Sequence, residues 1–127
     1  MKRIFSILLV ITLFATVLSG CAPDPQLTSH NVIIARAIVN AVDDYLDGNI
    51  SARAAHTRID EVSDDIDRDS GEIHREQTAA LRMSTSALRI RMELSALDFD
   101  GSGDVDTILE NRNAIARLAG LDNRRSV

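Results

Sequence analysis

The 127-residue sequence is poor in several residue types on which whole classes of protein depend. Cys21 is the single cysteine, so no disulfide can form within the chain. Trp is absent, and Tyr45 and Phe99 are the aromatic residues found beyond residue 21. Two rings cannot build a stacking platform for nucleic-acid bases, and carbohydrate sites also usually use aromatic faces. We therefore expect neither a nucleic-acid nor a sugar ligand.

Lysine is also scarce, because Lys2 is the only one and all later basic residues are arginines or histidines. The formal net charge is -5, and it becomes -7 when Lys2 and Arg3 are removed. A net negative chain disfavours nucleic acid and anionic lipid headgroups as partners. The sequence contains no nucleophile motif and no phosphate-binding loop. An enzyme is not expected.

One long apolar run is present, at the N-terminus. Lys2 and Arg3 precede the uncharged residues 4–17, and Leu-Ser-Gly-Cys follows at 18–21. The run matches the apolar core of a secretory signal. It is shorter than the roughly 20 apolar residues that span a bilayer. Residues 1–21 thus resemble the lipobox signal peptide of bacterial lipoproteins.

This resemblance implies that residues 1–20 are a signal peptide that is cut off, and that the Cys21 thiol carries a lipid. Family members usually gain an acyl chain on the new amine as well, and several chains anchor a protein far more firmly than one. Ala22, rather than Asp, follows the cysteine. This favours the outer membrane in a Gram-negative cell, whereas in a Gram-positive cell the protein would lie on the outer face of the cell membrane. The protein would face the periplasm or the cell exterior.

The part beyond the signal predicts an all-α domain, a small bundle of about four amphipathic helices. Residues 21–29 contain two prolines and are interpreted as a lipidated N-terminus and extended tether. Residues 30–120 form the bundle, and residues 121–127 are a loose tail. No alternation of apolar and polar residues indicates a strand.

The first two helices form a predicted hairpin. The first covers 30–47, with Ser29 or Asn31 as its N-cap and Gly48 after its end. Ser51 caps the second helix. Aspartates crowd the end of this second helix, where the helix dipole disfavours anions, so fraying is expected over 65–71.

The third helix is predicted over 72–97 and the fourth over 107–119, where Thr107 and Glu110 fit a capping box. A continuous third helix and one broken near 83–86 both fit the sequence. Its predicted core face is a row repeating every seven residues, widened by its neighbours. The row and its neighbours are Ile73, Ala80, Ala87 and Leu94, with Leu81, Leu88, Ile90 and Leu97.

Residues 98–106 resemble an EF-hand loop. Oxygen ligands alternate along it, and Gly103 stands at the sixth position, where the loop turns sharply. The resemblance implies calcium binding through Asp98, Asp100, Ser102, Asp104 and Asp106. The chain departs from the pattern at position twelve, where Leu109 replaces the bidentate Glu that supplies much of the affinity.

Two further acidic groups were considered as metal sites. Residues 65–76 echo the same loop pattern, and a pair of EF-hands would require the third helix to break near 84–86. His56, Asp60 and Asp64 share one face of the second helix. A solvated charged face is the favoured interpretation for these three, and turn chemistry for residues 65–76.

These observations predict a non-enzymatic, membrane-anchored lipoprotein that acts through protein contacts, either with another envelope protein or with its own copy. The alternative is a calcium-binding envelope lipoprotein with an EF-hand-like loop. Apart from Ca²⁺ in that alternative, no cofactor is expected.

Overall fold

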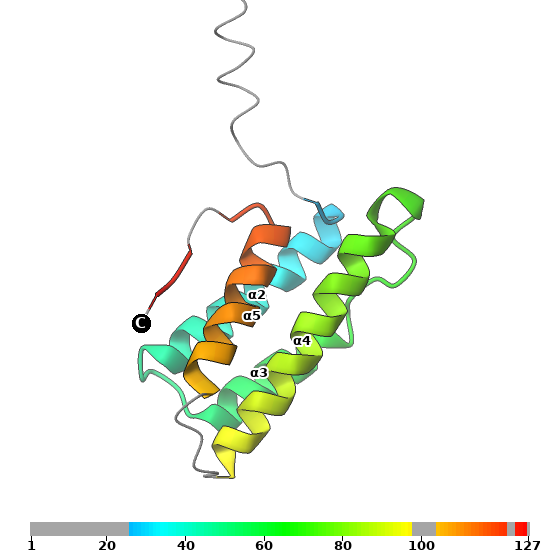
Figure 1. Cartoon of the computed structure of the whole chain (residues 1–127). Helices are drawn as coiled ribbons and strands as arrows, with labels where there is room; N and C mark the ends of the chain where they lie inside the picture. The colour runs from blue at the N-terminus through cyan, green and yellow to red at the C-terminus, as the bar shows by residue number, and fades with distance from the viewer. Residues whose placement is uncertain (1–25, 98–103, 122–123, 127) are drawn as a thin grey trace, which may run out of the picture.

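The computed structural model describes residues 26–97, 104–121 and 124–126, and their regular structure is entirely helical (Figure 1). This confirms the predicted all-α bundle. A short 3-10 turn, η1, precedes the third of the long helices. The elements are α2 Ser29–Leu46, α3 Ala52–Ser63, η1 Glu72–His74, α4 Arg75–Ala96 and α5 Asp104–Leu118.

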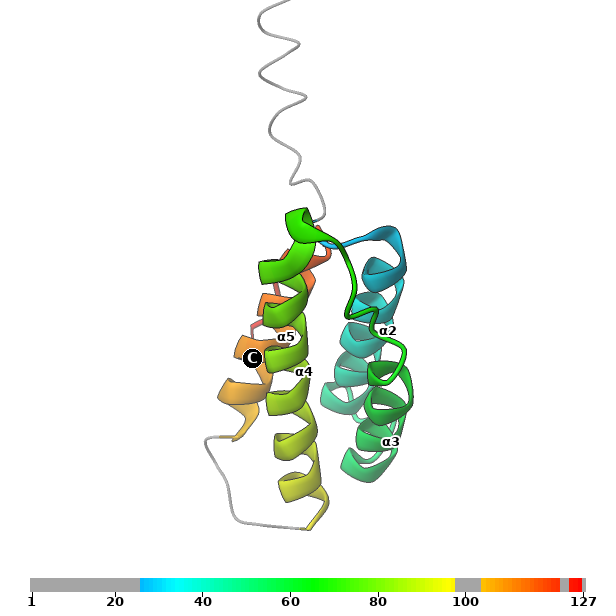
Figure 2. The ribbon, with the colours of Figure 1, turned by 90° about the vertical axis from the view of Figure 1, so that its right-hand side faces the viewer.

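The four helices run alternately up and down (Figure 2). Each of α2 and α4 packs against both α3 and α5, and α2 and α4 touch little because they lie on a diagonal. Helix α3 has 12 residues and α4 has 22. Because α3 is shorter, the segment 64–71 runs beside the bundle from the end of α3 to the start of α4 (Figure 2).

Aliphatic side chains from all four helices fill the core. Each one that is fully buried stabilises the fold by about 1.5–3 kcal/mol. The largest fully buried hydrophobic side chains are Ile38, Val39, Val42, Ile59, Leu81, Leu88, Met92, Ile108 and Ile115. The core thus holds α4 and α5 as firmly as the α2–α3 hairpin.

The helix ends follow the sequence in part. Gly48 has a φ of +78°, which glycine adopts without strain, and Ser51 Oγ accepts a hydrogen bond from the Ala54 N–H at 3.1 Å. Both predictions are confirmed. The predicted N-cap of α2 is wrong, because Thr28 Oγ1 accepts from the Asn31 N–H at 3.3 Å. Asn31 itself is completely buried.

Asn31 ties the segment 64–71 to α2. Its Oδ1 accepts from the Asp67 N–H at 2.9 Å, and its Nδ2 donates to the Asp67 carbonyl oxygen at 3.1 Å. Ile66 of the same segment is buried in the core. Helix α3 ends at Ser63, before the stretch 65–71 in which fraying was expected, and a side chain of α2 holds that stretch in place.

Both predicted flanks of the domain prove to be packed on the bundle. The Gln26 N–H donates to the Leu118 carbonyl oxygen at 3.1 Å, and Leu27 is 3% exposed. Residues 26–29 therefore belong to the bundle, and the tether predicted over 21–29 was drawn too long. The Leu121 N–H donates to the Ala116 carbonyl oxygen at 2.8 Å, so the tail predicted over 121–127 is docked where it begins.

Two predictions for the last helices need correction. Helix α4 is continuous through residues 83–86. Helix α5 begins at Asp104, three residues before the predicted start, so Thr107 lies inside the helix and does not cap it. The α4 result removes the break that a pair of EF-hands would require.

Replacing Asn31 by Ala should lower the free energy of unfolding by about 2–3 kcal/mol, because it strips the Asp67 N–H and carbonyl groups of their partners. Asn40→Ala, at an exposed position on the same helix, is the matched control and should change stability by less than about 0.5 kcal/mol. Urea denaturation followed by circular dichroism measures both. Equal effects of the two substitutions would contradict the role given to Asn31.

Candidate functional site

Large apolar side chains are exposed along the solvent side of α4 and at its two flanks, Ile73 in η1 and Leu97 directly after the helix. Ile73 is 87% exposed, Met83 is 74% exposed, and Ile90 and Leu97 are each 57% exposed. The helix buries its opposite side through Leu81, Leu88 and Met92. The predicted core face is correct in part, because its members Leu81 and Leu88 are buried. Its seven-residue row is wrong as the centre of that face. The members of the row are exposed at Ile73 and only half-buried at positions 80, 87 and 94.

Charge favours the side of α4 that enters the core. Glu76 and Glu93 are both exposed and lie on or beside the outer row, so turning that row inward would desolvate carboxylates. The polar residues on the buried side are Thr78 and Thr85, which carry no charge. Burying neutral hydroxyls costs much less than burying ions.

Arginines border this exposed surface. Helix α4 carries four arginines and two glutamates, so its net charge is +2 in a chain of net charge -5. Arg89 forms a salt bridge with Asp60 of α3. An apolar strip with charged borders is typical of a surface that contacts another macromolecule. We call residues 73, 80, 83, 87, 90, 94 and 97 the α4 outer face.

A second polar centre joins α2, α5 and the C-terminal tail. Arg112 is 2% exposed and donates to both carboxylate oxygens of Asp43, from Nε at 3.0 Å and from a terminal nitrogen at 2.9 Å. Arg125 of the tail donates to Asp43 at 3.3 Å and to Asp47 at 2.5 Å. The bidentate pair fixes α5 against α2, and Arg125 adds the tail.

Asn113 completes this network through the backbone of the tail. Its Oδ1 accepts from the Arg125 N–H at 2.9 Å and from Arg112 at 3.0 Å, while its Nδ2 donates to the Arg125 carbonyl oxygen at 2.8 Å. The hydrogen bond from Arg125 holds the pKa of Asp47 below its ordinary value. The tail predicted to be loose is thus anchored at Arg125.

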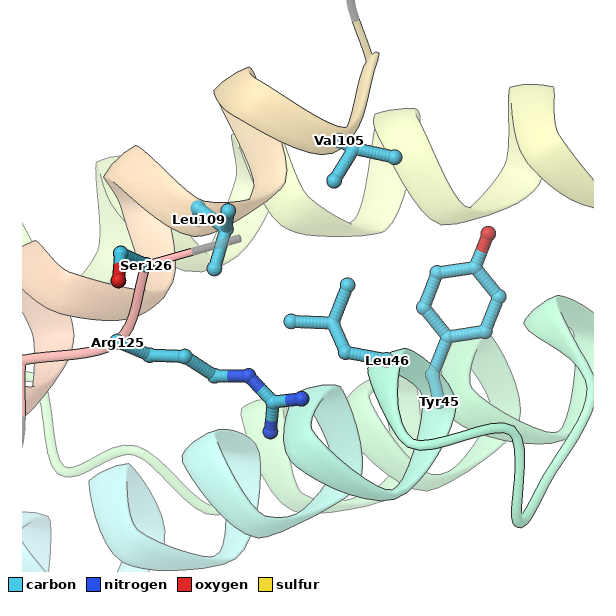
Figure 3. Close-up of a pocket in the computed structure, with 6 residues that line it drawn as sticks. All are labelled: Tyr45, Leu46, Val105, Leu109, Arg125 and Ser126. Atoms are coloured by element: carbon cyan, nitrogen blue, oxygen red, sulfur yellow. The ribbon is translucent and has the colours of Figure 1, made fainter.

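The same tail closes one side of a shallow groove of about 410 Å³ (Figure 3). Tyr45 and Leu46 of α2 face Val105 and Leu109 of α5 across it, and the Arg125 side chain runs along the edge nearest α2 (Figure 3). Its guanidinium is already paired with Asp43 and Asp47, so the described residues that line the groove offer no uncommitted charge to an anionic ligand.

The residues predicted to carry chemistry fall mostly outside the described part of the chain. Cys21, Asp98, Asp100 and Ser102 lie there. Asp104 starts α5, and Asp106 is exposed in its first turn. The seventh position of the EF-hand pattern is therefore already helical, whereas an EF-hand directs the backbone carbonyl of that position at the metal.

Within the ranges 26–97, 104–121 and 124–126, no three His, Cys, Asp or Glu side chains come together as a metal site. Asp60 of the His56, Asp60 and Asp64 group pairs with Arg89 instead. In the segment that echoes an EF-hand, the Asp69 N–H donates to Asp67 Oδ1 at 3.0 Å, which is turn chemistry.

Two histidines hold backbone segments in place, and their partners could not be predicted from local spacing. His30 Nε2 lies 2.7 Å from the Asp65 carbonyl oxygen, and His74 Nδ1 lies 2.9 Å from the Gln26 carbonyl oxygen. Asn31, Arg112 and Asn113 were missed for the same reason. Their partners lie between 12 and 69 residues away, and no local spacing reveals such pairs.

Replacing Arg125 by Gln should make unfolding less dependent on acid. The lowered pKa of folded Asp47 stabilises the fold at neutral pH, and this contribution disappears as the pH falls through that pKa, below the ordinary value of 3.8. The stability difference between wild type and variant should therefore shrink from pH 6 to pH 3, as measured by urea midpoints. Arg124→Gln, an exposed neighbour, should show no such trend. A difference that stays constant with pH would contradict the pairing.

The calcium hypothesis for residues 98–106 stays a prediction, and titration calorimetry tests it on the full chain in mild detergent. A calcium site should give saturable heat at or below millimolar Ca²⁺, and Asp98→Ala combined with Asp100→Ala should abolish it. Asp64→Ala, on an exposed residue elsewhere, is the control. Absence of heat at millimolar Ca²⁺ would end the hypothesis.

Comparisons with known proteins do not assign a function to this chain. In the described ranges, no helix combines the length and apolar character needed to cross a membrane. No family model, curated protein or solved structure matches the chain. A functional assignment must therefore be argued from the chemistry and geometry of the sites described above.

Proposed function

We propose that this chain is a lipid-anchored protein of the bacterial cell envelope whose helical bundle acts through protein contacts. Two features support the proposal: the lipobox-like residues 18–21, and the α4 outer face. The α4 outer face is the observation that carries the contact role. Met83, Ile90 and Leu97 lie in one row on one helix, whereas single exposed apolar residues on a protein surface are ordinary.

The packing of Gln26 and Leu27 shortens the proposed tether. Residues 22–25 remain for it, and at about 3.1 Å per residue they reach roughly 12 Å. The end of the bundle formed by Gln26, Leu118 and His74 would then lie close to the lipid headgroups. Helix α4 starts near this end and runs away from it (Figure 2).

The α4 outer face suits a contact role better than the groove beside Arg125 does. The groove is open, and its one guanidinium is engaged by Asp43 and Asp47. The α4 outer face runs for about 33 Å along a 22-residue helix, at 1.5 Å per residue. Its apolar centre and charged borders resemble the anatomy of a protein interface, with a dry core and a polar rim.

Replacing Cys21 by Ser should remove the lipid anchor and release the protein from the membrane fraction, because the proposed lipid is attached through this thiol. Wild type should incorporate an alkyne-labelled fatty acid, and Cys21→Ser should not. Ile33→Glu, at a position that is 67% exposed, leaves the thiol intact and is the control. Continued association of Cys21→Ser with salt-washed membranes would contradict the anchor.

A further inference from the structure

We propose that the α4 outer face binds the same face of a second copy of this chain, with the two α4 helices antiparallel. The inference rests on the contact role proposed above and names the partner for it. It is argued from the spacing, the sizes and the charges of residues along this one helix.

The spacing along the α4 outer face is that of a helix–helix seam. Its residues lie at positions 73, 80, 83, 87, 90, 94 and 97, separated by steps of three, four or seven, and Glu76 occupies the remaining position of this spacing. A repeat of this kind keeps one stripe facing a partner helix, so that side chains insert between those of the partner. Because the buried side of α4 already packs on α3 and α5, this stripe is a second seam.

Side-chain size favours the antiparallel arrangement. Ala80 and Ala87 alternate with Met83 and Ile90 along the seam. In an antiparallel pair, Ala80 meets Ile90 of the second copy, and Ala87 meets its Met83. Every central layer then combines one small and one large side chain, which keeps the helices evenly spaced. A parallel pair would stack Ala on Ala and Met on Met, and so would leave gaps between tight layers.

The ends of the seam are also complementary. In the same antiparallel register, Ile73 meets Leu97 of the second copy. Both side chains are more than half exposed in the single bundle, at 87% and 57%. Because the pairing is reciprocal, both ends of the dimer seam would be closed by an Ile–Leu contact.

Charges on the borders of the seam agree with this register. Glu93 falls between Arg75 and Arg82 of the second copy. Glu76 stands in the seam opposite Leu94, within one helical turn of Arg91 of the second copy. Each glutamate of α4 thus gains a cation, and the two-fold symmetry repeats each pair. A parallel pair would instead place Glu76 directly against Glu76 of the second copy, which is repulsive.

The antiparallel arrangement is compatible with anchoring in one membrane. The two-fold axis stands perpendicular to the plane of the two α4 helices. It therefore places the two Gln26 residues at opposite ends of the assembly. Anchoring of both chains in one bilayer therefore requires the α4 helices to lie along it, whereas a single anchored bundle can stand on its Gln26 end. Anchoring also raises the local concentration of the chains and so favours a weak dimer.

Size-exclusion chromatography with light scattering tests the dimer on the full chain in mild detergent. Wild type should have the mass of two chains at tens of micromolar, and Ile90→Glu should weaken dimerisation at least tenfold by placing a charge in the seam. Ile33→Glu, on an exposed site of α2, is the matched control and should stay dimeric. Unchanged thermal unfolding of Ile90→Glu monomers confirms that the fold is intact. A monomeric wild type at all concentrations would overturn the proposal.

Disulfide cross-linking in bacterial membranes tests the register. Chains carrying Ala80→Cys with one tag, co-expressed with chains carrying Ile90→Cys with another, should form a mixed disulfide. Chains carrying only the native Cys21 show the background from that thiol. Self-linking of Ala80→Cys without the mixed product would indicate a parallel pair and overturn the register. Absence of both products would overturn the seam.

The outcomes also separate this inference from the proposed function. If wild type is monomeric and Cys21→Ser still releases the chain from membranes, the lipid anchor is supported and the self-contact is rejected. If wild type is dimeric and the Cys21→Ser chain stays on membranes, the seam is supported and the lipid anchor is rejected. The Cys21→Ser chain can also be tested for binding to anionic phosphatidylglycerol vesicles. If it binds them and the further substitution Ile90→Glu abolishes the binding, the α4 outer face contacts lipid and the dimer is overturned.

Discussion

The structure depends on one constraint: α4 is apolar on two sides, and a four-helix bundle buries only one of them. Leu81, Leu88 and Met92 enter the core, and the opposite row stays in solvent. The carboxylates of Glu76 and Glu93 disfavour burial of the outer row without settling the choice, because burying an unpaired charge costs more than burying a threonine hydroxyl. The exposed apolar row follows directly from this choice, and so does the contact role proposed for it.

The rest of the bundle is adjusted by a few polar contacts between distant residues. Helix α3 is too short to line the whole length of α4, and Asn31 holds the segment after it against α2. The buried Arg112 joins α5 to α2 through Asp43. Removing one partner of such a pair leaves a buried polar group unsatisfied. These contacts are few, but each one therefore helps to specify how the helices are arranged.

The two proposed features of the protein lie on different parts of the bundle. Residue 26 enters at one end, where Leu118 and His74 hold it, whereas the α4 outer face extends along the side. A lipid on Cys21 would fix that end near a bilayer and leave the side of α4 open to a neighbour. The proposed two-fold pairing uses both features, since short tethers at opposite ends restrict how two bundles can meet.

The sequence alone determined the helical class, the ends marked by Gly48 and Ser51, and the lipobox-like pattern before Cys21, because each depends on residues within a few positions of one another. Tertiary structure alone decided which side of α4 is buried. A helical repeat shows that a row of residues is apolar, but this helix has two such rows and the core has room for one. Which row is buried depends on the side chains of α3 and α5 that pack against it. The docked tail and the pairing of Asn31 with the segment after α3 were likewise decided by folding, because their partners are distant in the chain.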